Sequence, residues 1–424
     1  MITQITTDIF TGAFQDVSEC HKYGLRSCNV VDVRHIVDKA GNDISYIVEA
    51  IRLAKGILDE HGKVLITCDM GVSRSRVIVI GLLAELGNDI DDCISLVLSS
   101  AKNPEINPDL LLLLRRFYIS KKPKDNARQV SAGTGIVVLG SKGFVGDALM
   151  RCLTEKQTNS IGLSRNEINI KEESVKLVTI LDSLKQPTVI LCAHPPSHHT
   201  AKALSDAILL LKNTLEACRL TGKRLIYISS MVVYLGNAHS SDCYIYPADE
   251  NTPVYPYGSY SESKYLCEQL INIYRNSYGV EITVVRPCGL YGSEMRPQWL
   301  IPKLIRKALN NDDIVTHSYQ NGLPSFELMH VDDFADAATR LIYDNQSPPS
   351  VNIGSHKLIS TYELAGQIAK IAQSSSNVSL LEISDQVRNI VTLPGYLDKI
   401  GWRSSIRLGD GLKMCISDFL GGSS

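Results

Sequence analysis

Hydrophobic positions along the chain follow two patterns that alternate. Short apolar runs, typical of strands buried on both faces, occur at 29–33, 63–67, 135–139, 160–163, 188–191, 225–228 and 281–285. Between them apolar residues return every three or four positions, as in the segment 44–58, which places Ile47, Ala50, Ile51 and Ala54 on one helix face. Strands that alternate with helices predict parallel β-α-β units, and therefore an α/β fold with a doubly wound sheet.

One polar stretch interrupts this alternation. Residues 121–134 contain Pro and Gly and show no hydrophobic period, so we interpret them as a linker between domains. We therefore expect a first domain over residues 1–120 and a second over residues 135–424. A chain of 424 residues is long enough for two or three domains.

Composition and charge exclude several classes of protein. The chain is 44% hydrophobic and 21% charged with a net charge of −2, which argues against disorder, nucleic-acid binding and an anionic membrane surface. The apolar run 77–84 is shorter than the ~18–20 residues of a spanning helix, and the segment MITQITTDIF lacks the features of a signal peptide. Eleven cysteines without a C-x-x-C pair indicate reduced thiols, so we expect a soluble cytoplasmic protein.

A cysteine and an arginine lie in the segment CDMGVSRS, residues 68–75, between a predicted strand and a predicted helix. Backbone N–H groups at a helix N-terminus favour anions, and the same field favours a thiolate at Cys68. The guanidinium of Arg74 can hold two oxygens of a phosphoryl group, and Gly71 permits the turn. The spacing therefore favours a site for a phosphate ester with a nucleophilic thiolate.

This segment resembles the phosphate-binding loop of the dual-specificity branch of the cysteine-based phosphatases. The likeness extends over residues 1 to about 120 and includes the helix start at 42–46 and the closing helix at 103–117. It implies a phosphomonoester substrate and a phosphocysteine intermediate. By the same resemblance Cys68 is the nucleophile, Arg74 binds the phosphoryl group, Ser75 assists release of the thiolate, and Asp38 is the general acid.

Thr67 stands where that family usually has His, directly before the cysteine. We expect the missing imidazole to raise the pKa of the thiol, and a carboxylate of Asp69 facing the loop to act in the same direction. The alternative is a phosphate-binding pseudophosphatase that serves as a docking module.

The second domain opens with a glycine-rich loop, residues 140–146, that follows a predicted strand and begins a helix. Such a loop lets the backbone approach a pyrophosphate at the helix N-terminus. Farther on, Ser230 follows another predicted strand, and the four-residue spacing of Tyr260 and Lys264 places both on one helix face. There the ammonium is expected to lower the pKa of the phenol from ~10 toward the working pH.

These motifs, over about 135–420, resemble the extended short-chain dehydrogenase/reductases, the sugar epimerase and dehydratase group. The resemblance implies a Rossmann-type domain with a small C-terminal substrate-binding part. It also implies that Ser230 binds the reacting oxygen, Tyr260 moves the proton and Lys264 additionally holds the nicotinamide ribose. The cofactor-binding residues it implies are Gly140, Lys142, Gly143, Phe144, Val145, Gly146, Ser164, Arg165 and Lys264.

The cofactor is expected to be NADP, with NAD as the alternative. Ser164 and Arg165 follow the second strand, where an arginine accommodates a 2′-phosphate, and the first acid comes only at Glu167. Gly289 and Phe326 replace an asparagine and an arginine common in the nucleotide-sugar members, which puts a standard diphosphate clamp in doubt. A sugar-type substrate is expected, and reduction, epimerisation and dehydration stay open.

The main hypothesis is a bifunctional enzyme, a phosphatase joined to an NAD(P)-dependent reductase, epimerase or dehydratase. The alternative is a phosphoprotein phosphatase regulated by an NADP-sensing domain, against which the intact set of Ser230, Tyr260 and Lys264 argues. We expect no bound metal, since His194, His198 and His199 lack further ligands at suitable spacing. A homodimer through the dehydrogenase-like domain is expected from the resemblance.

Overall fold

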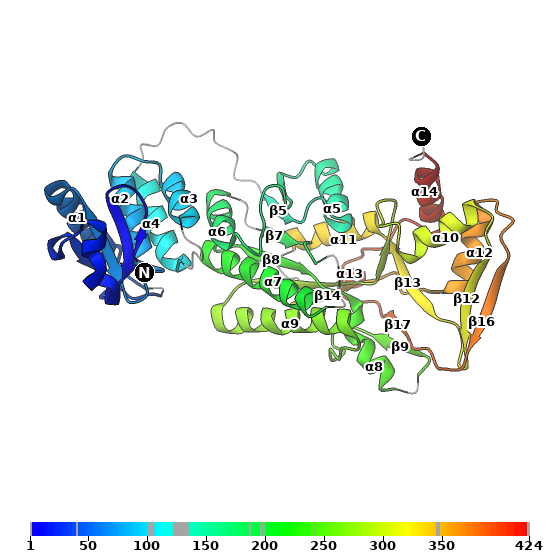
Figure 1. Cartoon of the computed structure of the whole chain (residues 1–424). Coiled ribbons are helices and arrows are strands. Elements are labelled where there is room, and N and C mark those ends of the chain that lie inside the picture. Colours follow the sequence, from blue (N-terminus) through cyan, green and yellow to red (C-terminus); the bar gives the residue numbers. More distant parts are fainter. Residues whose placement is uncertain are drawn as a thin grey trace. The chain divides into compact units, whose positions relative to one another are not determined.

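The computed structural model describes residues 2–39, 41–100, 106–121, 135–185, 188–195, 197, 200–241, 243–344 and 348–421. The chain divides into two compact units, unit 1 over Met1–Ser131 and unit 2 over Ala132–Ser424 (Figure 1). Of the predicted linker, residues 122–134 lie outside the described part. Each unit has its own sheet and its own buried core, and each is therefore described separately.

Unit 1 contains a four-stranded sheet in the order β1-β2-β4-β3. Its strands are β1 (Thr3–Gln4), β2 (Ile9–Ala13), β3 (Val30–Asp32) and β4 (Val64–Cys68), and both β2 and β3 run parallel to β4. The helices are α1 (Ile44–His61), α2 (Arg74–Glu85), α3 (Ile90–Ser99) and α4 (Pro108–Lys121). Because α2 follows β4 directly, the segment between them lies at the carboxyl end of the sheet.

The helices of unit 1 begin and end where the local sequence favours it. The side chain of Asp43 accepts a hydrogen bond from the Ser45 N–H at the start of α1, and Gly62 with φ of 70° ends this helix. Helix α2 is buried along most of its length, and at Gly81 an added Cβ would lie 2.1 Å from Cδ1 of Ile51. This close packing joins α2 to α1.

Unit 2 is built on a parallel sheet in the order β14-β10-β8-β7-β5-β6. The strands are β5 (Ile136–Leu139), β6 (Ser160–Leu163), β7 (Thr188–Leu191), β8 (Arg224–Ile228), β10 (Ile282–Pro287) and β14 (Ser350–Ile353). From β5 the chain goes to one side for β6 and then to the other for β7, which makes a topological switch point between β5 and β7. The predicted α/β class with a Rossmann-type parallel sheet is confirmed.

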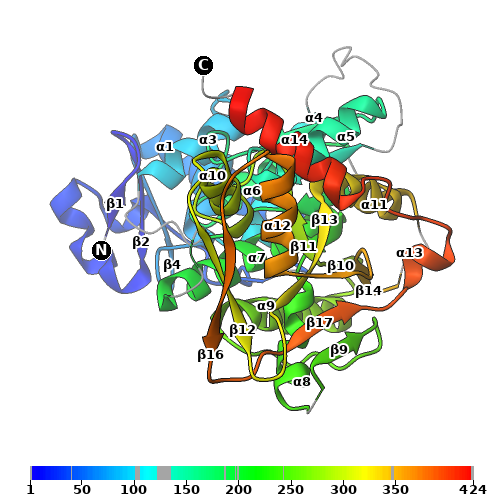
Figure 2. The same cartoon turned by 90° about the vertical axis from the view of Figure 1, so that its right-hand side faces the viewer.

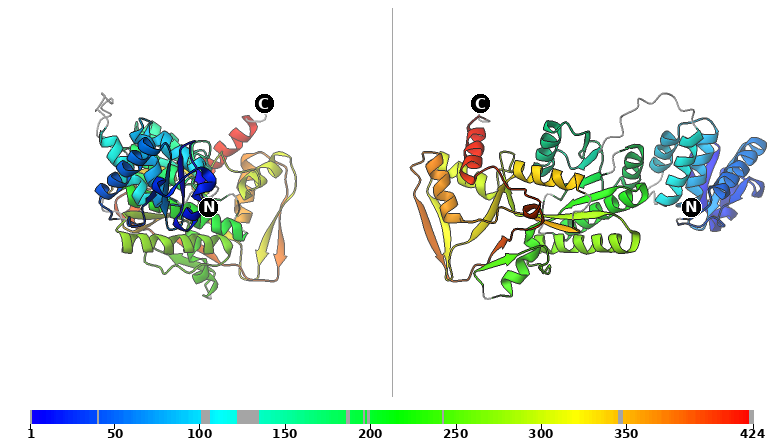
Figure 3. Two further views of the ribbon diagram at one scale, coloured as in Figure 1. Left: turned by 60° about the vertical axis from the view of Figure 1, so that its left-hand side comes forward. Right: turned by 180° about the vertical axis from the view of Figure 1, so that it is seen from behind.

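Helices cover both faces of this sheet. One layer consists of α5 (Phe144–Glu155) and α11 (Val331–Tyr343), which pack together. The opposite layer consists of α6 (Ser174–Ser183), α7 (Ala201–Thr221) and α9 (Ser259–Tyr278), as Figures 1 and 3 show from front and back. A sheet buried on both faces explains why its strands are continuous apolar runs.

Shorter strands and helices form the C-terminal part of unit 2 (Figure 2). The strands are β11 (Gly289–Tyr291), β13 (Ser325–His330) and β15 (Leu358–Ser360) in one sheet, with the pairs β12 (Ile314–Tyr319) and β16 (Val378–Ile383), and β9 (Ile245–Ala248) and β17 (Asn389–Thr392). The helices are α10 (Leu300–Leu309), α12 (Thr361–Ile371) and α14 (Leu408–Gly421), and near the Rossmann sheet lie α8 (Leu235–His239) and α13 (Tyr396–Lys399). Leu304, Ile305, Leu364 and Leu412 form a second core here.

Two general properties bear on function. Within the described residues, none of the helices combines the length and the apolar character needed to cross a bilayer. The same part of the chain contains no cluster of three or more His, Cys, Asp or Glu side chains arranged for a metal ion. Of the histidines weighed as ligands, His198 and His199 lie outside the described residues.

Candidate functional site

The glycine-rich loop of unit 2 lies at the switch point of the sheet. Gly140 has φ of +89°, and a Cβ on it would lie 2.6 Å from the backbone nitrogen of Ala193, directly after β7. A Cβ on Gly146 would lie 2.1 Å from the carbonyl oxygen of Gly140. Only glycine therefore fits at these two positions, where the loop packs tightly against the end of β7 and against itself at the N-terminus of α5, an arrangement that fits a pyrophosphate site.

A cavity of about 1060 Å³ extends from this loop across the carboxyl ends of the strands. Ser230, Tyr260 and Lys264 line it, and so do all the cofactor-binding residues implied by the resemblance. The residues on the cofactor side are Gly140, Lys142, Gly143, Phe144, Val145, Gly146, Ser164 and Arg165. The structure thus brings together side chains that are more than a hundred positions apart in the sequence.

The three candidate catalytic residues come from two elements. Ser230 follows β8, and its hydroxyl accepts a hydrogen bond of 3.4 Å from the N–H of Val232. Tyr260 and Lys264 lie in the first turns of α9, and the Lys264 ammonium donates to the carbonyl oxygen of Ile228 at 2.8 Å. The Lys264 Nζ is 5.9 Å from the centre of the Tyr260 ring. The carboxyl end of β8 and the first turns of α9 therefore place a hydroxyl, a phenol and an ammonium in one cavity.

The ionisation of the pair differs from the sequence-based expectation. Burial raises the pKa of Tyr260 to about 12, although the hydrogen bond with Ser230 opposes this change. Burial also lowers the pKa of Lys264 to about 8. The expectation that the ammonium brings the phenol pKa below its ordinary value is wrong for this structure, because burial dominates the shift of the Tyr260 pKa.

A buried ion pair fixes the elements that carry these residues. Arg286 on β10 donates to both carboxylate oxygens of Glu268 on α9, at 3.1 and 2.7 Å. Ser229 also donates to Glu268, at 2.5 Å, and Arg286 donates to the hydroxyl of Tyr234 at 2.6 Å. Since Ser229 directly precedes Ser230, this network holds the end of β8 against α9. Sequence analysis assigned no role to Glu268 or Arg286.

Of the residues discussed for the 2′-position, Ser164 and Arg165 line the cavity, whereas Glu167 does not. Arg165 is exposed and lines the cavity. The carboxylate of Glu167 folds back onto Ser164 and accepts hydrogen bonds from its N–H at 2.7 Å and from its hydroxyl at 2.6 Å. The hydrogen bonds with Ser164 hold the pKa of Glu167 below its ordinary value. An ionised carboxylate therefore lies beside Ser164, shortly after the end of β6.

The other end of the cavity is lined by residues that sequence analysis missed. Arg296, Trp299 and Arg388 belong to it, and Phe326, which sequence analysis did name, lines the same part. His194 was considered only as a metal ligand, yet its ring lies edge-on to Tyr260 with 5.8 Å between the ring centres. Apart from Arg296 and Trp299, which are three positions apart, these side chains come from distant segments, and no local spacing marks them as neighbours.

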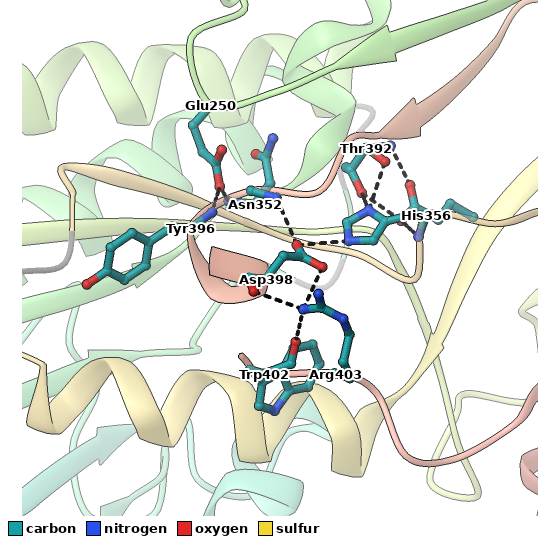
Figure 4. A network of polar contacts seen from close by, with 10 residues as sticks. Glu250, Asn352, His356, Thr392, Tyr396, Asp398, Trp402 and Arg403 are labelled. Carbon is teal, nitrogen blue, oxygen red and sulfur yellow. Dashed lines mark hydrogen bonds and ion pairs between the residues drawn. The ribbon is translucent and has the colours of Figure 1, made fainter. Parts of the chain in front are cut away.

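Polar contacts hold the segment after β17 against the Rossmann sheet (Figure 4). The carboxylate of Glu250 accepts from the N–H groups of Asn352 at 3.2 Å and Tyr396 at 3.1 Å. His356 contacts the carbonyl oxygen of Thr392 through Nδ1 at 2.8 Å and the carboxylate of Asp398 through Nε2 at 3.1 Å. These contacts hold the segment from Thr392 to Asp398 in place. Because Arg388, which lines the cavity, directly precedes β17 and this segment, the network also supports one wall of the cavity.

In unit 1, Cys68 ends β4 and the following loop leads into α2. Gly71 in this loop has φ of +67°, and a Cβ on it would lie 2.4 Å from the carbonyl carbon of Gly12 on β2. The Gly71 N–H donates to the Sγ of Cys68 at 3.2 Å, and the Ser75 Oγ lies 3.4 Å from this sulfur. The loop therefore curls around the sulfur with its N–H groups directed inward.

The surroundings of Cys68 favour the thiolate. Burial opposes its ionisation, but hydrogen bonds from the side chain and backbone of Ser75 and from the backbone of Gly71 and Val72 outweigh it, and the pKa of Cys68 lies below its ordinary value. This direction agrees with the thiolate expected at Cys68 from the loop. The hydroxyl of Thr67 donates to the carbonyl oxygen of Val31, and Asp69 pairs with Arg74 at 2.5 Å. The effect of Thr67 in place of the family's His stays a prediction.

The other residues predicted for this site lie around the same loop. Arg74 donates to the carbonyl oxygens of Arg34 and Ile36, both at 3.1 Å. Asp38 accepts a hydrogen bond of 2.7 Å from the hydroxyl of Ser73. Asn107, which sequence analysis missed as a site residue, donates through its N–H to Ser73 and through its amide to the carbonyl oxygen of Asp38. The structure thus joins the segment of Asp38 to the loop of Cys68.

Comparison with known proteins bears on unit 2. UDP-glucuronic acid decarboxylase 3 of Arabidopsis thaliana is 22% identical over 327 residues, which cover 71% of this chain and 93% of the relative. Human dTDP-D-glucose 4,6-dehydratase is 24% identical over 202 residues, which cover 46% of this chain and 55% of that protein. The crystal structure of a Thermus thermophilus UDP-glucose 4-epimerase with NAD shares the fold, with a TM-score of 0.58 at 19% identity over 68% of this chain and 99% of that one.

The model of the family described as "NAD dependent epimerase/dehydratase family" matches residues 136–354, just over half of the chain. The match begins after unit 1 and contains the glycine-rich loop, Ser230, Tyr260 and Lys264. Its description confirms the nicotinamide dinucleotide predicted as the cofactor. The chain therefore belongs to the NAD dependent epimerase/dehydratase family.

Proposed function

We propose that unit 2 oxidises a hydroxyl group of a nucleotide-linked sugar at its bound NAD, as the first step of an epimerisation, dehydration or decarboxylation. The observation that carries this proposal is the cavity that Ser230, Tyr260 and Lys264 share with the glycine-rich loop. The named activities of the plant decarboxylase and the human dehydratase, both of which act on nucleotide sugars, support this class of substrate.

The chain's own residues account for binding and proton transfer. The glycine-rich loop and the N-terminus of α5 bind the pyrophosphate, and Lys264 holds the nicotinamide ribose. Ser230 binds the oxygen of the reacting hydroxyl, while Tyr260 takes its proton as the carbon–oxygen double bond forms. When bound, NAD supplies the acceptor for the hydride. This proton transfer requires Tyr260 as the phenolate, and the hydrogen bond with Ser230 and the nearby Lys264 ammonium are the groups that would offset the burial that raises the pKa of Tyr260 to about 12.

The test is product analysis with UDP-glucuronic acid, UDP-glucose and dTDP-glucose. We expect Tyr260→Phe to lower turnover by roughly 10²–10⁴-fold, the usual size of a general acid–base contribution. Tyr257→Phe is a matched control, because Tyr257 is 56% exposed, stacks on His239 and does not line the cavity. Wild-type turnover in Tyr260→Phe, or equal losses in both variants, would contradict the proposal.

For the choice between cofactors, we favour NAD over the NADP expected from Arg165. The ionised carboxylate of Glu167 beside Ser164 would repel a 2′-phosphate and can accept a hydrogen bond from a ribose hydroxyl. The description of the family supports the same choice.

We also propose that unit 1 hydrolyses a phosphomonoester through Cys68. The thiolate attacks phosphorus, a sulfur–phosphorus bond replaces the ester bond, and Asp38 gives a proton to the leaving oxygen. Water then attacks the phosphocysteine, releasing inorganic phosphate and restoring the thiolate. The lowered pKa of Cys68 and the contacts that join Asp38 and Arg74 to its loop support this proposal.

Steady release of p-nitrophenol from p-nitrophenyl phosphate tests this activity. We expect Cys68→Ser to abolish release and Cys93→Ser to preserve it, since burial raises the pKa of the Cys93 thiol to about 11 and this residue lies on α3, away from the loop. Absence of release by the wild type would favour the pseudophosphatase alternative.

The remaining predictions concern the whole chain. The alternative of an NAD(P)-sensing unit that regulates a phosphoprotein phosphatase requires that Tyr260→Phe leave phosphatase control intact.

A homodimer through unit 2 stays a prediction. The exposed side chains of Leu209, Leu266 and Ile273 on α7 and α9 support it, and light scattering coupled to gel filtration tests it. The cytoplasmic location also stays a prediction.

A further inference from the structure

Thr11 on β2 takes part in a buried chain of hydroxyl contacts that ends at the sulfur of Cys68. Its side chain is fully buried, and its hydroxyl donates to the Oγ of Ser75 at 2.8 Å. The thiol of Cys68 donates to the same Oγ at 3.4 Å, so that once the thiol has ionised the hydroxyl of Ser75 can take over as the donor. Strand β2 runs parallel to β4 with Ala13 opposite Cys68, so Thr11 reaches Ser75 from the neighbouring strand.

The direction of these hydrogen bonds matters for the thiolate. The hydroxyl of Ser75 has a single hydrogen, and it can stabilise a negative sulfur only if this hydrogen points toward Cys68. A donor on the oxygen of Ser75 occupies its acceptor side and strengthens the hydrogen bond that it gives in turn. Thr11 is this donor, and its full burial excludes water as a replacement.

We propose that Thr11 is a positioning residue that acts through Ser75 to stabilise the thiolate of Cys68. The functional meaning of this role rests on the proposed phosphatase activity. The role itself concerns the acidity of the Cys68 thiol, which can be measured without any turnover. No motif in the sequence marks Thr11, because the contact depends on the pairing of β2 with β4.

The contribution of the Thr11 and Ser75 hydroxyls to the acidity of Cys68 can be separated from that of the charged groups nearby. From the loop, Arg74 is paired with Asp69, and from the segment before α1, Asp38 is bonded to Ser73. From α2, the buried Arg76 interacts electrostatically with Cys68. A Thr11 variant leaves all four charges in place, so that a change in the acidity of Cys68 reports on the hydroxyl chain alone.

The experiment measures the rate of alkylation of Cys68 by iodoacetamide in the full-length protein as a function of pH. Peptide mass spectrometry resolves Cys68 from the other ten cysteines, and Cys93 serves as an internal reference. We expect Thr11→Val to raise the midpoint of the profile of Cys68 by about half a pH unit or more. Thr11→Ser, which keeps the hydroxyl, should restore the wild-type midpoint.

Thr67→Val is the matched control, because Thr67 is equally buried on the adjacent strand and its hydroxyl donates to the carbonyl oxygen of Val31 instead. An unchanged midpoint in Thr11→Val, or an equal rise in Thr67→Val, would overturn the proposal. If Thr11→Val loses the cooperative unfolding transition of unit 1, Thr11→Ala decides in its place by the same criterion.

The same samples separate this inference from the proposed phosphatase. A raised midpoint in Thr11→Val together with a wild type that releases no p-nitrophenol would support the hydroxyl chain and refute the phosphatase. Release by the wild type together with an unchanged midpoint would refute the hydroxyl chain and leave the phosphatase standing.

Discussion

The side chain of Lys264 combines full burial with a charge that the proposed chemistry needs. Burial lowers its pKa to about 8, whereas a lysine in an unfolded chain keeps its proton to about pH 10.4. The unfolded state therefore binds more protons between these values, and the stability of unit 2 due to this group rises with pH across that range. At neutral pH the ammonium is retained at some expense of stability.

The same shift predicts the pH dependence of cofactor binding. Because Lys264 is proposed to hold the nicotinamide ribose as an ammonium, NAD affinity should fall as pH rises through about 8. In Lys264→Arg, whose guanidinium stays charged, this fall should be absent. Calorimetric titrations with NAD from pH 6 to 10 measure it, and an identical fall in Lys264→Arg would show that another group is responsible.

Glu167 should decide between the two cofactors at the end of β6. We expect the wild type to bind NAD more tightly than NADP, and Glu167→Gln to lose roughly tenfold or more in NAD affinity, as for a hydrogen bond to a charged group. Glu172→Gln, an exposed change a few residues later, is the control. Tighter binding of NADP by the wild type would restore the NADP preference based on Arg165.

At the level of elements, the ion pair between Arg286 and Glu268 joins β10 to α9. Glu268→Ala leaves Arg286 buried without its carboxylate, so we expect a loss of about 3–5 kcal/mol in the free energy of unfolding of unit 2. Asp410→Ala removes an exposed pair with Lys413 and should change it by less than about 1 kcal/mol. Urea unfolding followed by circular dichroism compares the two, and equal small effects would contradict the role given to the buried pair.

The sequence predicted those features that depend on the residue pattern within a single strand or helix. Strands β5 to β8 and β10 are apolar runs because both faces of their sheet are covered, and the four-residue spacing alone placed Tyr260 and Lys264 together. Strands β1, β2, β9 and β11 to β17 were not predicted, and most of them lie in small sheets or pairs outside the Rossmann sheet, although β14 belongs to that sheet. Without β2, the contact of Thr11 with Ser75 could not be anticipated.

Local sequence patterns could not predict the ionisation of the site residues or the residues that line the far end of the cavity. The pKa directions of Cys68, Tyr260 and Lys264 depend on how completely each side chain is desolvated and on which donors reach it, and these follow from packing across several elements. Arg296, Trp299 and Arg388 meet only because the C-terminal strands fold back onto the Rossmann sheet. Their separation in the sequence hides this.

For the molecule as a whole, the two units carry two separate sets of candidate catalytic residues. Cys68, Arg74, Ser75 and Asp38 belong to unit 1, whereas Ser230, Tyr260 and Lys264 belong to unit 2 and lie within the family match. We therefore expect Cys68→Ser to leave NAD-dependent turnover within about twofold of the wild type, and Tyr260→Phe to leave aryl phosphate hydrolysis equally unaffected. A variant that abolished both activities would favour regulation of one unit by the other.

The most direct test of the central claim follows the absorbance of NADH in the NAD-loaded, full-length protein after rapid mixing with a nucleotide sugar. UDP-glucuronic acid, UDP-glucose and dTDP-glucose are the substrates to try. The account predicts transient reduction of the bound NAD in the wild type and in Cys68→Ser, and its loss in Tyr260→Phe with NAD still bound. No reduction with any of these sugars, or unchanged reduction in Tyr260→Phe, would contradict it.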